Sequence, residues 1–478
     1  MKNKPAFIIC LLMIFLLSSC ATTENKPVFG SDSLKPRIVV LTDIAPGDIE
    51  PDDMESMIRL LVHADLYEIE ALIVSGGWNS SGRAYPKSWK DSLTTVIDTY
   101  EKDLPNLMKR SEQTSFLPVE KESEKQMIGY WPSPDYLRSR AMYGSLELGV
   151  AQLGEENHSD GSDFIIRLVD ETDDRPLWVL AWGGANTLAQ ALWKVKQERS
   201  EAEAKTFARK LRVYTITDQD VPIGDAKNFA FSSHQWMRKE FGKDIHFIWD
   251  ESAWLNQNDL GSKSWNEYAT HIQKHGNLGR IYPKNKWGVE GDTPSFLHVL
   301  PNGLHDPSES KETGWGGYFE WGMSRDGITS CYTNVDERVK EISNRYEHYF
   351  YPATFANFAA RMDWANEGKG NRNPVVIVNK EKGLEAIHIA TQTGKTVTLD
   401  ASKSYDPDGD NLRFHWWAMP EPGTYNGSIE IENANSPRAT LLIPTDAAGK
   451  TMHVICEVTD DGAHLLKSYR RVILEAIQ

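Results

Sequence analysis

The sequence predicts an α/β domain with an open, mostly parallel sheet, followed by a small all-β sandwich. Two observations predict this order. In the first part of the 478-residue chain, short apolar strands alternate with helical segments, which is typical of a parallel sheet covered on both faces. After Asn371 only short strands with turns between them are expected, over about a hundred residues, the usual size of a sandwich. The linker-like residues 368–374 separate a predicted domain over 37–367 from one over 374–478.

Each element is predicted from its local pattern. Residues 37–42 are apolar and β-branched, which indicates a buried strand, and residues 52–63 follow with helical periodicity. Residues 251–327 are rich in Gly, Trp, Asn and Pro and are expected to form long functional loops. The other strands are expected at 68–74, 177–182, 211–217, 245–249, 375–378, 396–399, 412–417, 440–443, 453–458 and 470–474, and the other helices at 91–104 and 186–196.

The N-terminus has the pattern of an export signal. Lys2 and Lys4 precede twelve apolar residues, which are too few for a membrane-spanning helix and suit a signal peptide over 1–19. The sequence Leu-Ser-Ser-Cys that ends at Cys20 resembles a bacterial lipobox, so Cys20 is expected to carry a lipid. Ala21 rather than Asp after it implies outer-membrane sorting. Residues 20–36 are expected to form a flexible tether.

Composition narrows the possible partners. There are 52 Lys and Arg against 68 Asp and Glu, a net charge of −16, which excludes a nucleic-acid backbone as partner and suits a cation or a neutral sugar. Besides Cys10 and Cys20, only Cys331 and Cys456 remain. They are expected to be buried free thiols in different domains.

An acidic segment follows the first predicted strand. Asp43, Asp48, Glu50, Asp52 and Asp53 fall within eleven residues at the carboxyl end of that strand, where open α/β sheets bind ligands. Capping of the next helix explains one or two of these carboxylates. Five carboxylates repel one another unless a cation lies among them, so the segment predicts a divalent metal site.

This pattern resembles the nucleoside hydrolases, whose first strand ends in Asp-x-Asp-Pro-Gly-x-Asp-Asp and whose carboxylates hold Ca²⁺. Residues 182–192 resemble the loop of that family in which a main-chain carbonyl, by this match that of Asn186, completes the metal shell. Residues 303–307 contain His305-Asp306-Pro307, similar to the His-Asp-Pro of the family, in which Asp binds the metal and His can protonate the leaving group. Asn79 is placed like a family Asn that touches the sugar.

The whole chain resembles a narrower group, the bacterial nucleoside-hydrolase-like proteins described as cellulose-binding. Residues 290–297, which contain Asp292, and the order of the motifs carry this resemblance from about residue 37 to 475. Those proteins join an α/β domain of nucleoside-hydrolase type to a C-terminal sandwich. Here residues 399–410 and 458–462 resemble PKD and related immunoglobulin-like domains. The Asp406 loop alternates its acids as Ca²⁺ ligands do, although a solvated turn explains it better.

The chain departs from the nucleoside-hydrolase pattern. Leu41 stands where the first Asp of the motif is expected, and the segment up to Asp52 is five residues longer, so Asp48 or Glu50 could replace the lost carboxylate. The resemblance therefore implies the metal more strongly than the nucleoside substrate.

The resemblance gives each candidate residue a role. The expected Ca²⁺ ligands are Asp43, Asp53, the Asn186 carbonyl and Asp306. Asp43 also takes the proton of the attacking water, and His305 is the candidate acid, or else a loop histidine near the metal. The expected substrate contacts are Asp52, which could equally be a helix cap, Asn79, Asp292, and Trp78, Trp182 and Trp315, each of which could stack on sugar or be structural.

Three functions remain open. The first is a surface-anchored, metal-dependent hydrolase of N- or O-glycosyl bonds that acts on a saccharide. The second is a carbohydrate-binding lipoprotein without catalysis. The third is an exported nucleoside hydrolase.

Overall fold

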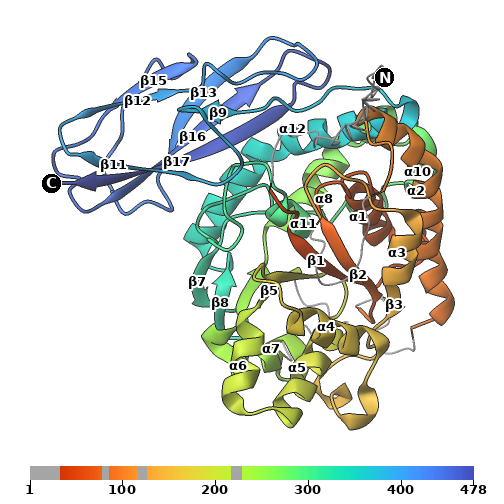
Figure 1. Ribbon diagram of the computed structural model, residues 1–478. Helices are drawn as coiled ribbons and strands as arrows, with labels where there is room; N and C mark the ends of the chain where they lie inside the picture. The colour runs from red at the N-terminus through yellow and green to blue at the C-terminus, as the bar shows by residue number, and fades with distance from the viewer. Residues whose placement is uncertain (1–32, 78–84, 117–125, 217–228) are drawn as a thin grey trace, which may run out of the picture.

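The computed structural model describes residues 33–77, 85–116, 126–216 and 229–478. An eight-stranded sheet forms the centre of the first domain, with strand order β3-β2-β1-β4-β5-β6-β8-β7 (Figure 1). Neighbouring strands are parallel except β7 and β8, so the predicted mostly parallel α/β fold is confirmed. The strands are β1 (Arg37–Thr42), β2 (Glu68–Val74), β3 (Ala141–Tyr143), β4 (Leu177–Ala181), β5 (Leu211–Ile216), β6 (His246–Asp250), β7 (Glu320–Met323) and β8 (Ser330–Thr333).

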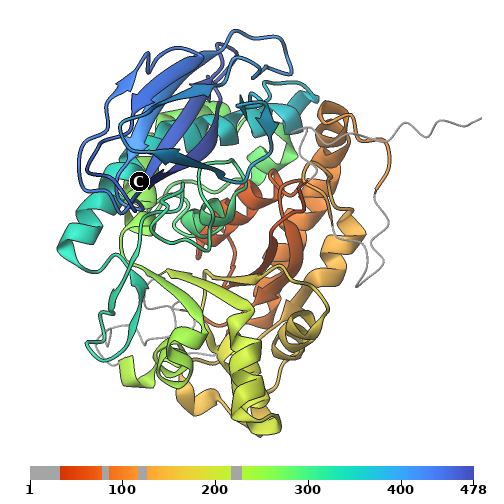
Figure 2. The same ribbon diagram turned by 60° about the vertical axis from the view of Figure 1, so that its left-hand side comes forward.

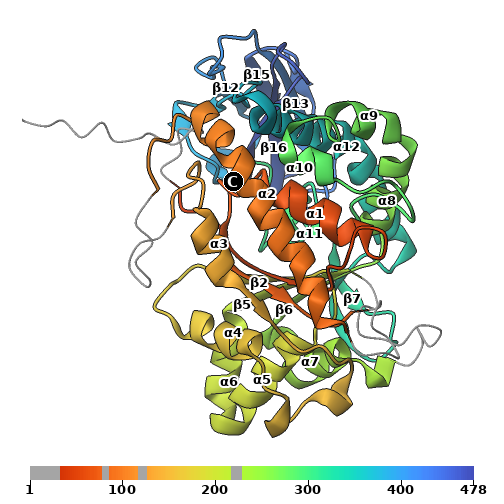
Figure 3. The same ribbon diagram turned by 90° about the vertical axis from the view of Figure 1, so that its right-hand side faces the viewer.

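Helices cover both faces of this sheet, because each central strand is apolar on both sides. Ile38 and Val40 of β1 pack into one core with α1, α2, α11 and α12, whereas Val39 and Leu41 pack into a second core with α4 to α7. Figure 3 shows the sheet between these two layers. The helices are α1 (Pro51–Leu61), α2 (Lys90–Arg110), α3 (Pro134–Arg140), α4 (Asp160–Asp170), α5 (Asn186–Glu198), α6 (Glu201–Arg209), α7 (Ser233–Phe241), α8 (Ala253–Lys263), α9 (Trp265–His271), α10 (Gly276–Ile281), α11 (Thr293–Val299) and α12 (Glu337–Glu367).

The C-terminal region is the predicted β-sandwich. A four-stranded sheet, β11-β17-β16-β13, packs on a three-stranded sheet, β12-β15-β14, and the core between them includes Trp416, Leu441 and Val454. In Figure 1 the sandwich lies beside α12, at the end of the molecule that holds the C-terminus. Its strands are β9 (Ile377–Val378), β10 (Glu381–Lys382), β11 (Ile387–Gln392), β12 (Thr396–Asp400), β13 (Arg413–Met419), β14 (Ile431–Glu432), β15 (Arg438–Leu442), β16 (Thr451–Thr459) and β17 (Lys467–Ile477).

The sandwich is fixed to the α/β domain by polar contacts. Arg471 of β17 donates through Nε to the carbonyl oxygen of Leu304 at 2.8 Å, and Tyr349 of α12 donates to a Glu457 carboxylate oxygen at 3.0 Å. Figure 2 shows β17 and its neighbours over α12 and the loops that follow α11. Arg471 is 1% exposed, so the two domains share a buried interface.

Several parts of the first domain differ from the sequence prediction, which gives none of α3, α4, α6, α7, β3, β7 and β8. Residues 251–327, expected as loops, contain α8 to α11, and Tyr268, Tyr282 and Trp315 of this segment are buried in the first core. The long helix α12 is not predicted either. This helix packs against α2, α8 and α10 and the sandwich on several sides, so its apolar residues form no single stripe.

The predicted tether is packed rather than flexible at its end. Lys35 is fully buried, and its Nζ donates to the carbonyl oxygens of Ala64 at 3.2 Å and Tyr130 at 2.6 Å. The signal peptide, Cys20 and residues 20–32 lie outside the described residues. Within the described part of the chain, no helix has the length and apolar character needed to span a bilayer. Cys331 and Cys456 are buried free thiols, as expected.

Candidate metal centre at the carboxyl edge of the sheet

Acidic side chains from three segments meet beyond the carboxyl end of β1. Asp43 directly follows β1, Asp52 and Asp53 lie in the first turn of α1, and Asp292 precedes α11. Asp43, Asp53 and Asp292 are each at most 2% exposed. The start of a helix favours carboxylates because its N–H groups carry partial positive charge. Local structure therefore places four carboxylates at the edge where α/β sheets bind ligands.

The turn after β1 is held by Thr42. Its Oγ1 accepts a hydrogen bond from the Ile44 amide at 3.1 Å and donates to Oδ1 of Asp53. The Asp43 and Asp53 carboxyl groups lie within hydrogen-bonding contact. Glu50, Asp52 and Asp53 each place an oxygen within 4.8 Å of the others. Glu50 therefore belongs to the cluster, as the sequence analysis considered, whereas Asp48 is exposed and outside this group.

The acids of the cluster repel one another. Burial raises the pKa of Asp53 well above its ordinary value, and the charges of Asp43 and Asp52 raise it further. Burial also raises the pKa of Asp292, with added contributions from Asp53, Asp52 and Asp43. Burial and the same neighbours raise the pKa of Glu50. The neighbouring charges that act most on these three groups are all carboxylates, so the cluster concentrates negative charge.

Glycines line the carboxylates closely. A Cβ on Gly77, after β2, would lie 2.1 Å from Oδ2 of Asp43, and one on Gly183, after β4, would lie 2.9 Å from Oδ1 of the same residue. A Cβ on Gly291 would lie 2.9 Å from Oδ2 of Asp52. Any side chain at these positions would collide with the carboxylates. Glycine in these three loops therefore leaves room for the carboxylates of Asp43 and Asp52.

The donor set fits a hard divalent cation. Oδ2 of Asp292 is buried and finds no hydrogen-bond donor among the described residues. A buried carboxylate oxygen without a donor is costly unless a cation or water satisfies it. All the candidate ligand atoms are oxygens, the ligand type that Ca²⁺ takes, usually six to eight at a time. Glu50, Asp52 and Asp53 have oxygens within 4.8 Å of one another, and the buried carboxylates of Asp43 and Asp292 lie close enough to act on them, so this set could hold such an ion.

A buried hydrogen-bond network around Glu290 fixes the turn that leads to Asp292. The Glu290 carboxylate accepts hydrogen bonds from Tyr282 at 3.0 Å and Tyr268 at 3.1 Å, and it forms an ion pair with Arg59. Its backbone has φ = 61°, an unusual value for a residue other than glycine. Its amide donates to Oε2 of Glu55 at 2.7 Å. These contacts hold a strained turn two residues before Asp292.

Trp182 and Asn186 position this edge rather than face a ligand. Trp182 is fully buried, and its Nε1 donates to Oγ of Ser295 in α11 at 2.6 Å, so the predicted sugar stacking by Trp182 is wrong. Asn186 begins α5, and its side-chain amide exchanges hydrogen bonds with the main chain of Gly149 at 2.9 and 3.0 Å. The contacts of the Asn186 side chain are structural, and its carbonyl remains a predicted ligand.

His305 and Asp306 lie at the other end of the strands, beside the amino ends of β1 and β4. Both line a cavity of about 1040 Å³ together with Pro36, which precedes β1, and Pro176, which precedes β4. Six residues of β1 at about 3.3 Å each separate this edge from Asp43. Asp43 and Asp306 therefore cannot bind the same ion, and the predicted metal role of Asp306 is wrong. The physical reason is that the loop after α11 returns to the amino ends of the strands.

The surroundings of His305 and Asp306 also disagree with their predicted roles. Burial, with added effects of His298 and Arg471, lowers the pKa of His305 well below its ordinary value, so the ring is a poor proton donor at neutral pH. Asp306 is exposed, and its Oδ1 accepts a hydrogen bond from the Ser308 amide at 2.9 Å, as in an ordinary turn.

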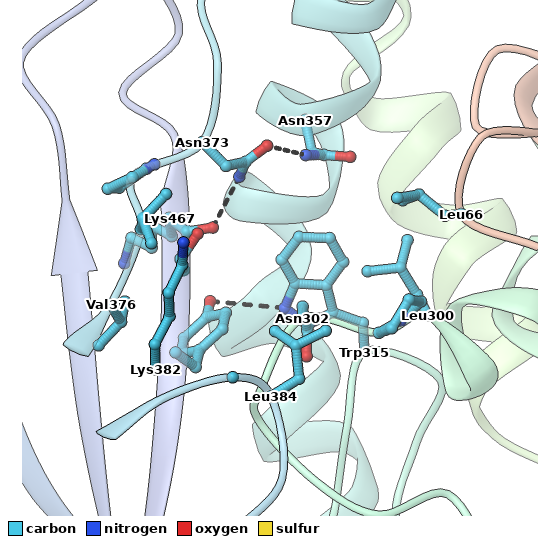
Figure 4. Close-up of a pocket in the computed structure, with 16 residues that line it drawn as sticks. Leu66, Leu300, Asn302, Trp315, Asn357, Asn373, Val376, Lys382, Leu384 and Lys467 are labelled. Atoms are coloured by element: carbon cyan, nitrogen blue, oxygen red, sulfur yellow. Dashed lines mark hydrogen bonds between the residues drawn. The ribbon is translucent and has the colours of Figure 1, made fainter. Parts of the chain in front are cut away.

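Trp315 lies at the domain interface. Its Nε1 donates to the Tyr469 hydroxyl at 3.4 Å, and it lines a small pocket of about 40 Å³ together with Asn302 and Asn373 (Figure 4). Because Trp315 is only 5% exposed and packs on the sandwich, its predicted contact with sugar at the carboxylate cluster is wrong. Trp78 and Asn79 lie outside the described residues.

Two residues near the cluster were missed. The Tyr85 hydroxyl donates to the Ile44 carbonyl, and the charges of Asp43 and Asp53 add to the burial that raises the pKa of Tyr85. Trp287 is 66% exposed, and the neighbouring Lys286 donates to the main-chain carbonyl of Asp48. The only sequence signal for Trp287 was the abundance of Trp in residues 251–327, which does not distinguish an exposed ring from a buried one.

Comparisons with known proteins agree with this fold. The family model described as "Cellulose-binding Sde182, nucleoside hydrolase-like domain" matches residues 37–319, and "Cellulose-binding protein Sde0182, C-terminal domain" matches residues 396–476. A solved structure of a nucleoside hydrolase-related hypothetical protein from Saccharophagus degradans, described as associated with carbohydrate metabolism, is 33% identical. The match covers 92% of this chain and 100% of that one, with a TM-score of 0.76.

Two shorter matches involve the sandwich region. The PKD domain from KIAA 1837 protein is 22% identical over 20% of this chain and 82% of its own, with a TM-score of 0.15. The titin M3 domain is 16% identical over 22% of this chain and 97% of its own, with a TM-score of 0.14. We draw no conclusion from these two. Among curated proteins no sequence matches the chain.

Proposed function

This chain belongs to the family of cellulose-binding proteins with a nucleoside-hydrolase-like domain, and we propose its function on that basis. The family associates the chain with carbohydrate. We propose that it is a surface-anchored, metal-dependent hydrolase of N- or O-glycosyl bonds that acts on a saccharide. The observation that carries this proposal is the carboxylate cluster at the ligand-binding edge, with a buried Asp292 oxygen that lacks a donor among the described residues.

The cofactor we propose is Ca²⁺. Asp43, Asp53 and Asp292 would hold it together with Glu50 and Asp52, because the first three are buried, their charges act on one another, and the oxygens of Glu50, Asp52 and Asp53 lie within 4.8 Å of one another. When bound, a Ca²⁺ ion supplies a Lewis acid that makes water a better nucleophile and a charge that orders sugar hydroxyls.

The residues of the chain would then divide the work of hydrolysis. Asp43 would accept the proton of the attacking water at a carboxylate oxygen, since this buried carboxylate directly follows β1 and lies against Gly77 and Gly183. Asp52, half-buried at the margin, would accept a hydrogen bond from a sugar hydroxyl. Trp287 is exposed, Lys286 lies over one face of its ring at 4.0 Å, and the other face would stack on a saccharide.

The anchor we propose is a lipid on Cys20, which would hold the protein at the outer membrane. Replacement of Cys20 by Ser should release the protein from the membrane fraction into the soluble fraction of the producing cell. Retention of the Cys20→Ser protein in the membrane fraction would contradict the anchor without affecting the proposed chemistry.

A second candidate function is carbohydrate binding without catalysis. It is favoured by the position of His305, which leaves the cluster without the acid that the resemblance to nucleoside hydrolases implies. A nucleoside hydrolase that lacks this acid is a weaker candidate, although nucleosides belong among the tested substrates.

The experiment that tests the proposal measures product release by the mature protein with Ca²⁺ present. Cello-oligosaccharides and other plant-type oligosaccharides are offered in parallel with inosine and uridine. We expect the unaltered protein to release sugar. Asp43→Asn should abolish this activity, whereas the control Asp48→Asn should keep it, because the Asp48 carboxylate lies outside the cluster. Release of free base would instead favour a nucleoside hydrolase. Oligosaccharide binding without any product would favour the non-catalytic function.

A further inference from the structure

The helix α8 reaches the carboxylate cluster, because it starts at the carboxyl end of β6. The backbone amides of residues 252–254 all donate to the carboxylate of Asp250, at 2.8–3.0 Å, and this fixes the first turn of the helix. Further along α8, the Gln257 side chain donates to Oε2 of Glu290 at 3.2 Å. Glu290 lies two residues before Asp292, so the same network holds the helix and the turn that leads to the cluster.

One face of α8 lies directly against the loop 287–291. A Cβ on Gly288 would lie 2.7 Å from Oδ1 of Asn258, and a Cβ on Gly261 would lie 2.6 Å from Cβ of Val289. Asn258 and Gly261 are three residues apart, so they share this face of the helix. Both contacts require glycine, on the loop in one case and on the helix in the other.

The same loop brings Asn258 beside Asp52. A Cβ on Gly291 would lie 3.1 Å from Nδ2 of Asn258 and 2.9 Å from Oδ2 of Asp52. The amide and the carboxylate therefore flank one point, directly before Asp292 in the chain. A side chain at Gly291 would come between them, and glycine leaves both groups free to act on one ligand.

Two polar groups on this face of α8 lack hydrogen-bond partners. Oδ1 of Asn258 is buried and meets no donor among the described residues. Nε1 of Trp254, four residues earlier and on the same face, is buried and meets no acceptor in the described part of the chain. Such groups are costly to leave unpaired. One of them accepts and the other donates, and a hydroxyl group can do both, so the missing partner has the chemistry of a sugar hydroxyl.

The other end of the loop carries an exposed aromatic ring. Trp287, next to Gly288, is 66% exposed. Lys286 contacts this ring and donates to the main-chain carbonyl of Asp48, so the ring lies beside a residue whose carboxylate is outside the cluster. The loop therefore leads from the cluster, past Asn258, to an apolar surface on which a sugar ring can stack.

We propose that α8 and the loop 287–291 form a subsite for the sugar unit next to the one at the metal centre, and that the substrate is an oligosaccharide. This inference rests on the proposed function. Asn258 hydrogen-bonds a hydroxyl of this second unit, and Trp287 stacks on its ring. A neutral amide and an aromatic ring suit an uncharged sugar, whereas an anionic sugar would be repelled by the acidic cluster.

The test compares glucose with cellobiose by calorimetric titration of the full mature chain with Ca²⁺ present, since the family is described as cellulose-binding. We expect cellobiose to bind the unaltered protein about 30-fold more tightly than glucose, because only its second unit occupies the subsite. Asn258→Leu and Trp287→Ala should each weaken the binding of cellobiose about tenfold and leave the affinity for glucose within about twofold.

Asn256→Leu is the matched control on the same helix. The Asn256 amide donates to Oδ1 of Asn344 at 2.7 Å and to Glu347. Its loss should lower the melting temperature by about 2–4 °C without changing the affinity for cellobiose. Asn258→Leu should do the opposite and leave the melting temperature unchanged or raised, because it removes a buried oxygen that has no donor among the described residues.

Equal affinity of the unaltered protein for glucose and cellobiose would overturn the subsite. The same affinity for cellobiose in the unaltered, Asn258→Leu and Trp287→Ala proteins would overturn it too. Trp287→Ala changes an exposed side chain, so it decides the matter even if Asn258→Leu fails to fold. Failure of both sugars to bind the unaltered protein would instead contradict the proposed function on which the subsite rests.

Discussion

The two edges of the parallel sheet both carry buried acids, but they balance those acids differently. At the amino edge, Glu68 is paired with Arg175 and Glu70 with Arg37, each at 2.6 Å. At the carboxyl edge, the charges that act most on Asp53 and Asp292 are other carboxylates. The amino edge is therefore neutralised by the chain itself, whereas the carboxyl edge concentrates negative charge. This difference supports our proposal that a cation binds at the carboxyl edge.

The largest expected effect is on the free energy of unfolding and comes from breaking an ion pair at the amino edge. Arg37→Met should lower the free energy of unfolding by about 3–5 kcal/mol, because it leaves the buried Glu70 carboxylate without its partner. Urea denaturation measures this change. Ca²⁺ affinity should stay the same, and a loss of affinity in Arg37→Met would mean that the two edges are not independent.

Added Ca²⁺ should stabilise the protein by a comparable amount. At 1,000 times the Kd, ligand binding contributes about 4 kcal/mol to the free energy of unfolding. Thermal denaturation of EDTA-treated protein with and without Ca²⁺ measures the effect. In Asp43→Asn the part of the shift due to the carboxyl edge should disappear, and a shift of unchanged size would place the ion elsewhere.

Lys35 provides a pH test of the amino edge. Burial lowers the pKa of Lys35 to about 8, although Asp65 and Glu68 partly oppose the shift. Between about pH 8 and 10.5 the unfolded chain binds more protons at this lysine, so the native protein gains stability relative to Lys35→Met as pH rises, by about 3 kcal/mol in all. Denaturation of both proteins across this range measures the difference. A constant difference would contradict a buried, deprotonating lysine.

A smaller effect distinguishes positioning from sugar contact at the carboxyl edge. Trp182→Phe removes the hydrogen bond to Ser295 and should lower the free energy of unfolding by about 1–3 kcal/mol. Saccharide affinity should fall much less than in Trp287→Ala, whose ring is exposed. Equilibrium binding to a cello-oligosaccharide compares the two variants. Loss of binding in Trp182→Phe with unchanged stability would restore the stacking role.

Local patterns were sufficient to predict the fold class. The β-branched run of β1, the strand β2 at residues 68–74 and the helix that begins at Asn186 are determined by their own periodicity. The helix α12 could not be found in this way, because its partners lie on several sides and come from distant parts of the chain.

The carboxylate cluster could be predicted best where sequence neighbours build it. Asp43, Asp52 and Asp53 are joined by one turn, so their meeting follows from the strand that precedes them. His305 and Asp306 show the limit, since a three-residue motif carries no information about which edge of the sheet its loop reaches. Asp292 was predicted at the site as a substrate contact, and the structure places it among the carboxylates instead, through a turn fixed by Glu290 whose positive φ and buried partners are visible only in three dimensions.

The central claim is that the carboxyl edge binds a divalent cation through Asp292 and its neighbours. Calorimetric titration of EDTA-stripped mature protein with Ca²⁺, for the unaltered chain and for Asp292→Asn, tests it most directly. We predict that one binding event is lost or weakened at least 100-fold in Asp292→Asn. Identical isotherms for the two proteins would contradict the claim.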